Sequence, residues 1–248
     1  MEFSLNLKNP PIKEAILNIQ VESPAELKVE TLAKCRPQAL KRQYPNQSNT
    51  QEFTSEFGLG ANVKSSASTQ HKGYVFGSRD EKQAYQVSAS GFTFNRLARY
   101  PGWATFYSEA KKLWDMYCSV VNPASISRVS LRYINRFDIP LASVELEEHF
   151  RTFPVVPHKL PQTMVGFFFR YNLMVEEIQS VATITLVPDA PAQEGHSSII
   201  LDIDLFRQAE LPEPGDSEGL ARVFESMKPW KNKIFSDCLT ESTLKRCS

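Results

Sequence analysis

The stretch Ser127–Pro140, SRVSLRYINRFDIP, determines the fold that the sequence predicts. Two sets of side chains alternate along it: Val129, Leu131, Tyr133, Asn135 and Phe137 in one set, and Arg128, Ser130, Arg132, Ile134 and Arg136 in the other. Successive side chains of a strand point to opposite faces of a sheet, so the alternation predicts a strand with one buried face. Three arginines recur at every fourth position on the other face, their ends about 26 Å apart at roughly 3.3 Å per residue.

These arginines need counter-groups, because arginine keeps its charge in a folded protein. Asp202 and Asp204 lie on one face of a second expected strand. Three interpretations of the two acids stay open: they pair with Arg132 and Arg136, they face solvent, or they hold Mg²⁺. The arginines can also bind an anionic ligand or a nucleic-acid backbone. The candidate ligand-binding residues are therefore Arg128, Arg132, Arg136, Asn135, Asp202 and Asp204.

Composition and charge narrow the class of protein. The 248 residues carry 28 basic and 28 acidic side chains, a balance that disfavours nucleic acid as the partner. The four cysteines form no CxxC pair, and we expect no disulfide framework or zinc site. Because there is no secretory signal and no apolar run approaches the ~20 residues that span a bilayer, we expect a cytoplasmic protein without membrane contact.

Hydrophobic periodicity and turn residues predict the remaining elements. Helices are expected at 25–42 (divided at Pro37), 103–121, 141–150 and from 217 onward, where Pro229 should kink or divide the last one. Further strands are expected at 12–22, 163–176, 179–187 and 197–208, with a hairpin over 73–97. The polar stretch 46–72 is expected to be a mobile surface loop apart from a short strand.

This order predicts an α+β protein of two related halves, each an antiparallel sheet covered on one face by a long amphipathic helix. The proline-rich link after the central strand is the best boundary, which gives an N-terminal half at 1–142 and a C-terminal half at 143–248. The halves form a coarse repeat within one compact unit.

No catalytic signature is present. His71, His149, His158 and His196 show no paired spacing, and the glycines of GLGAN are too isolated for a dinucleotide fingerprint. We therefore predict no catalytic residue, no resident metal and no cofactor, and favour a binding protein over an enzyme without excluding the enzyme.

Several stretches resemble a sporadically distributed family of uncharacterised bacterial proteins of about this length. They are NPPIKEAILNIQVE, YPGW, LRYINRFDIP, LDIDLF and KIFSDCLTES, of which LRYINR, at 131–136, is the most specific. The resemblance covers nearly the whole chain. It implies a bacterial, cytoplasmic protein with the patchy inheritance of defence or toxin–antitoxin genes, and it brings no catalytic residues.

Two functions follow as hypotheses. The first is a non-enzymatic binding or regulatory protein whose protein partner is encoded nearby, and which is also compatible with a homo-oligomer. The second is a sensor of a phosphate-bearing ligand, or a metal-dependent enzyme, that uses Arg132 and Arg136 with Asp202 and Asp204.

Overall fold

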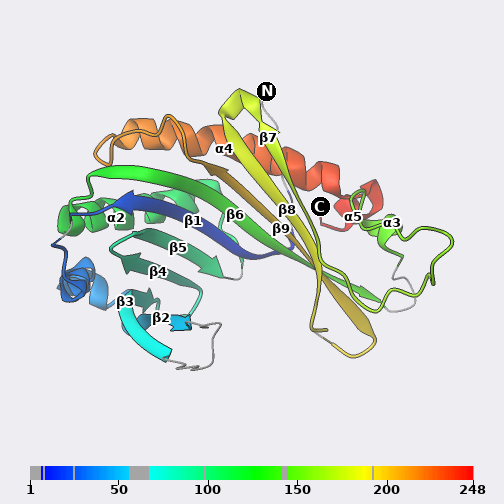
Figure 1. Cartoon of the computed structure of the whole chain (residues 1–248), viewed down its shortest axis with the longest axis horizontal. Coiled ribbons are helices and arrows are strands. Elements are labelled where there is room, and N and C mark those ends of the chain that lie inside the picture. The colour runs from blue at the N-terminus through cyan, green and yellow to red at the C-terminus, as the bar shows by residue number, and fades with distance from the viewer. Residues whose placement is uncertain are drawn as a thin grey trace, which may run out of the picture.

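The computed structural model describes residues 7, 9–24, 26–55, 67–97, 99–140, 145–191 and 193–247. Its nine strands are β1 (Ile12–Glu22), β2 (Asn46–Ser55), β3 (Ala67–Gly77), β4 (Gln83–Ser88), β5 (Gly91–Leu97), β6 (Ser125–Pro140), β7 (Phe169–Val175), β8 (Ser180–Asp189) and β9 (His196–Arg207). They form one sheet in the order β2-β3-β4-β5-β1-β6-β9-β8-β7 (Figure 1).

A single nine-stranded antiparallel sheet corrects the predicted pair of sheets. The expected architecture of two halves, each with its own sheet and helix, is wrong because the central strands continue the hydrogen-bonded ladder without a break. β6 pairs with β1 on one side and, over twelve residues, with β9 on the other. Joining the strands in this way satisfies backbone groups that two separate sheet edges would leave unpaired. The sheet thus runs across the expected boundary at residue 142, and the division into two domains stays a prediction.

The central strand and its alternation are confirmed. β6 includes all of the predicted stretch, and its buried positions include Val129, Leu131 and Tyr133. Its register sets Leu131 between Leu17 of β1 and Leu205 of β9. Three central strands therefore contribute one continuous apolar layer to the core.

Two long helices cover that apolar layer. They are α2 (Trp103–Val121) and α4 (Ser217–Cys238), both expected from their helical spacing, and they lie on the same side of the sheet (Figure 1). Tyr107 of α2 and Phe224 of α4 are in ring contact at 5.9 Å. Within the part of the chain that the structure describes, no long helix packs on the opposite face, which bears the arginines of β6 and which we call the uncovered face.

The start of α4 is fixed by a cap. The Asp216 carboxylate accepts a hydrogen bond from the backbone N–H of Gly219 at 2.8 Å, which satisfies one of the helix's free donors. Pro229 lies inside α4, which continues through it as one assigned helix. The expected division of this helix is therefore not observed.

Short helices occupy the connections. They are η1 (Val29–Cys35), α1 (Gln38–Lys41), α3 (Leu146–His149), η3 (Glu176–Ile178) and α5 (Glu241–Arg246). The helix expected at 25–42 is instead a 3-10 turn and a single α-turn on either side of Pro37, because proline lacks the N–H that a continuous helix needs. Residues 141–144 of the expected short helix lie outside the described residues.

Polar composition misled the prediction for 46–72. β2 and β3 form an antiparallel pair there, from Asn46 opposite Gly77 to Ser55 opposite Ala67, with residues 56–66 outside the described residues. Cross-strand backbone hydrogen bonds do not depend on side-chain polarity, and an edge strand gains from polar side chains that keep its free side hydrated. In the other half, β7 begins at Phe169 rather than at the expected Thr163.

Within the described residues no helix is both long enough and apolar enough to cross a membrane.

Candidate functional site

The arginine row, defined as Arg128, Arg132 and Arg136, lies on the uncovered face of β6 beside the acids of β9. The register places Arg132 directly opposite Asp204, and Ile134 opposite Asp202. This proximity follows from the alternation of both strands, since each strand turns its charged side chains to the same face of the sheet.

Arg132 binds Asp202 through two parallel hydrogen bonds. Its Nε and Nη2 donate to the two carboxylate oxygens at 2.8 and 2.6 Å. This bidentate geometry is the strongest form of an arginine–carboxylate contact. The hydrogen bond to Asp202 raises the pKa of Arg132 further, although partial burial opposes the effect.

Arg128 pairs with Asp204 in a less exposed setting. Its Nη2 donates to Asp204 Oδ2 at 2.9 Å, and its guanidinium lies 4.5 Å from the ring centroid of Phe206. The other carboxylate oxygen, Asp204 Oδ1, is buried without a hydrogen-bond partner. Burial raises the pKa of Asp204, and the attraction of Arg128 only partly offsets it.

Arg136 joins a third cluster at the end of the row. It donates to Asp138 Oδ1 at 3.1 Å, to Asp189 Oδ2 at 2.9 Å and to the Ser198 hydroxyl at 2.8 Å. Burial alone would raise the pKa of Asp138, but hydrogen bonds from Ser198 and Arg136 lower it on balance. Lys13 also reaches Asp189, at 3.2 Å.

Asn135 is separated from the other candidates. It faces the covered side of the sheet, where it is almost completely buried, and its side-chain amide donates to the backbone oxygen of Leu201 at 3.1 Å. The structure therefore brings five of the six candidates onto one face and leaves Asn135 on the other. Because each arginine has a carboxylate partner, the row presents no free guanidinium to an anion in this arrangement.

The described residues contain no cluster of three or more His, Cys, Asp or Glu side chains suited to a metal ion. Asp202 and Asp204 bond to different arginines, so their carboxylates do not converge on one point.

A cleft of about 580 Å³ opens between the first turns of α2 and strands β4 and β5. Its size suits a small ligand. Its polar side chains, however, bond to one another. Glu109 Oε1 accepts hydrogen bonds from Gln43 Nε2 at 2.7 Å and from the Tyr44 hydroxyl at 2.8 Å, and Arg96 donates to Gln83 at 2.9 Å. We assign no ligand to this cleft.

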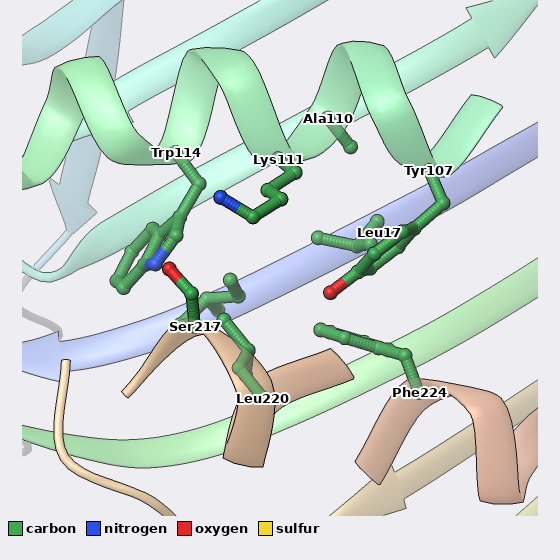
Figure 2. Close-up of a pocket in the computed structure, with 9 residues that line it drawn as sticks. Leu17, Tyr107, Ala110, Lys111, Trp114, Ser217, Leu220 and Phe224 are labelled. Atoms are coloured by element: carbon green, nitrogen blue, oxygen red, sulfur yellow. The ribbon is translucent and has the colours of Figure 1, made fainter. Parts of the chain in front are cut away.

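A second crevice, between α2 and the first turns of α4, is nearly filled by side chains (Figure 2). Trp114, Leu220, Phe224 and Leu17 close around it, and its free volume of about 10 Å³ admits at most one water molecule. This crevice is part of the helix-to-helix packing.

The most unusual exposed stretch of the described residues is apolar. We call it the apolar segment: Val155, Leu160, Met164, Val165, Phe168, Leu173 and Met174, which are seven of the eight large hydrophobic side chains described as exposed. Val165 is fully exposed, Phe168 is 71% exposed and Met174 is 67% exposed. The first five lie in the loop before β7 and the last two in β7 itself.

Sequence reasoning missed the apolar segment as a surface. The sequence predicts a strand over 163–176, which contains the run Met164–Phe169, and a domain link at Pro154, Pro157 and Pro161. The three prolines could have indicated this exposure. Proline lacks the N–H that strand pairing needs, so residues 154–161 are poorly suited to join a sheet, and the apolar side chains beside them are then not buried by strand pairing.

No protein-family model matches the chain, and no curated protein is found to be similar to it in sequence. The site must therefore be interpreted from its own chemistry.

Proposed function

We propose that the protein is a non-enzymatic binding protein that regulates another protein and contacts it through the apolar segment. The observation that carries the proposal is the concentration of exposed hydrophobic side chains in residues 155–174. Single exposed apolar residues are ordinary on protein surfaces, whereas seven of them within residues 155–174 are more than scattered exposure accounts for, and a partner that covers them would remove that area from water.

The loop part of the segment suits binding for a second reason. Pro154, Pro157 and Pro161 fix backbone torsions along it, so less conformational entropy is lost when a partner orders the loop. The large side chains of Met164, Val165 and Phe168 then supply apolar contact area that is already exposed.

The resemblance to a sporadically distributed bacterial family supports a partner encoded beside this chain. Patchy inheritance is typical of defence and toxin–antitoxin loci, in which a regulatory protein and its target travel together. The proposed partner is therefore the product of a neighbouring gene.

Co-expression with the neighbouring gene product tests the proposal. We expect the two proteins to co-purify and Val165→Asp to weaken the complex at least tenfold, because the side chain is fully exposed and its replacement should not disturb folding. Leu97→Asp is the matched control, since Leu97 is the one described exposed large hydrophobic residue outside the segment. Equal binding by wild type and Val165→Asp would contradict the proposal.

The second hypothesis, a phosphate-ligand sensor or metal-dependent enzyme, has less support because each arginine of the row already pairs with a carboxylate of β6, β8 or β9. Its test is a thermal melt with and without Mg²⁺ and a nucleoside triphosphate. A rise in melting temperature that Arg132→Ala abolishes would favour this function over the first.

A further inference from the structure

β7 is the last strand of the sheet, and only one of its sides is paired. β8 lies along one side, with the register running from Phe169 opposite Leu186 to Val175 opposite Ser180. Among the described residues no strand pairs with the other side. An edge of this kind presents unpaired N–H and C=O groups to any strand that can align with them.

We propose that β7 pairs antiparallel with β7 of a second copy of this chain, about a two-fold axis at Asn172, so that the sheets of two subunits join into one. The inference rests on the proposed function in one respect. The second copy contacts the β7 part of the apolar segment, and the loop part stays available to bind the product of the neighbouring gene.

The register follows from the strand's own length. Centring the axis on Asn172 is the one antiparallel arrangement that pairs all seven residues of β7, with Phe169 opposite Val175 of the partner subunit. It is also isologous, so that each copy uses the same surface, as closed homodimers do.

Charge complementarity supports this register. Arg170 comes to lie opposite Met174 of the partner subunit. Glu176 of the partner subunit is the first residue of η3 and directly follows the paired strand, on the side toward which the long Arg170 side chain can extend. Arg170 and Glu176 are both exposed, and neither forms an ion pair within the described part of its own chain. The two-fold axis creates the charge pair twice.

The apolar side chains are covered by the same register. Phe168 directly precedes β7 and comes to lie near Met174 of the partner subunit, where a thioether beside an aromatic ring is a favourable contact. On the other face, exposed Leu173 comes to lie opposite Tyr171 of the partner subunit.

The first four residues of the opposite edge lack these features. β2 begins with Asn46, Gln47, Ser48 and Asn49, which are exposed and polar, and offers no apolar side chain at those positions. The two edges thus differ in chemistry, and the self-complementary one is β7.

Sedimentation equilibrium of the purified full chain, without any other protein, tests the inference. We expect twice the mass of one chain for the wild type. Met174→Arg places a positive charge opposite Arg170 of the partner subunit and should yield the monomer, whereas Leu97→Arg, on β5, should leave the dimer intact. Arg170→Glu and Glu176→Arg should each weaken association at least tenfold, and the double variant should restore it. A monomeric wild type at about 50 µM would overturn the inference, because a weaker association is not a standard stable interface.

Oxidative crosslinking tests the register itself. Asn172→Cys lies on the axis, where paired Cα atoms are about 4.5–5.5 Å apart, a distance that suits a disulfide. Arg170→Cys is the matched control. Position 170 pairs with position 174 of the partner subunit, so the two introduced thiols lie four residues apart along the strands and are too far from each other to form a disulfide. We expect a covalent dimer from Asn172→Cys only. The native Cys35, Cys238 and Cys247 are buried, and Cys118, which is partly exposed, is replaced by serine in both variants. Crosslinking through position 170 in place of 172 would overturn the register.

The two proposals fail separately. A monomeric chain that still binds the neighbouring gene product through Val165 would remove only the β7 pairing. A dimer whose partner binding ignores Val165→Asp would remove only the proposed function.

Discussion

Arg132 bonds to Asp202, although the strand register places Asp204 directly opposite it. The diagonal choice leaves Asp204 to Arg128, which lies four residues earlier on β6. Arg128 and Arg132 therefore bind one acid of β9 each and do not compete for the same carboxylate. These two ion pairs link β6 to β9 on the uncovered face of the sheet.

Asp202→Ala should destabilise the protein by about 1 kcal/mol, because the bidentate contact is lost while Arg132, whose side chain is 43% exposed, can still be hydrated. The loss should shrink as salt is added. Urea unfolding at low and high ionic strength measures it. Asp237→Ala is the control, since its partner Lys233 is also exposed and lies in the same helix. Identical losses for both variants would contradict the assignment.

Asp204→Asn should change how stability depends on pH. Burial raises the pKa of Asp204 in the folded state, so the native protein binds a proton more readily than the unfolded chain does. The stability that this proton contributes is present below the unfolded pKa, near 3.8, and is lost as the pH rises through the folded value. Wild type should therefore lose stability relative to Asp204→Asn as pH increases across this window. Chemical denaturation at a series of pH values checks the sign, and parallel curves would contradict it.

Lys231→Met should stabilise the protein most at neutral and acidic pH. The Lys231 amino group lies 4.0 Å from the ring centroid of Tyr133, and burial, with a smaller contribution from Lys228, lowers its pKa to about 7. Between pH 7 and about 10.5 the unfolded chain binds this proton and the folded chain does not, so the wild type gains stability as the pH rises.

The advantage of Lys231→Met should consequently shrink between pH 7 and 10. Thermal melts of both proteins across that range measure the difference. Lys228→Met, which removes a more exposed amino group of the same helix, is the matched control. A gap that widened with pH would contradict the burial of the amino group.

Trp114→Ala should cost about 3–5 kcal/mol, because the side chain is almost fully buried and its removal leaves a cavity. Trp103→Ala should cost less, since Trp103 is only half-buried at the first position of α2 and its indole N–H bonds to exposed Glu225. Guanidinium unfolding compares the two variants. Equal losses would contradict the packing of α2 described here.

Hydrophobic periodicity correctly predicted the strands and helices that bury one face. β6, α2 and α4 lie where the spacing of Leu131, Trp114 and Phe224 placed them, because an element that buries one face must repeat apolar residues at its own period. How the strands join was not predictable in this way. Whether Leu131 and Leu205 belong to one sheet or to two depends on pairing between residues 74 positions apart, which leaves no local trace.

The candidate site was predictable only in part. Alternation placed Arg128, Arg132 and Asp202 on solvent-side faces, and their meeting then required only that β6 and β9 be neighbours. The specific pairing did not follow, because the reach of each side chain selects a diagonal partner over the direct one. The exposure of Val165 and Phe168 could not be predicted from the sequence either, since a run of apolar residues has the same composition whether it is buried in its own chain or exposed for a partner.

The position of β6 between β1 and β9 has a consequence for synthesis on the ribosome. β1 is complete once residue 22 has emerged, and β6 can join it after residue 140, but β9 arrives only with residue 207. At a translation rate of about 5–20 residues per second, β6 spends several seconds with the edge that β9 will pair with still unpaired. A nascent chain in that interval exposes an unpaired strand edge that is prone to aggregation, so translational pausing between codons 141 and 195 should lower the yield of soluble product.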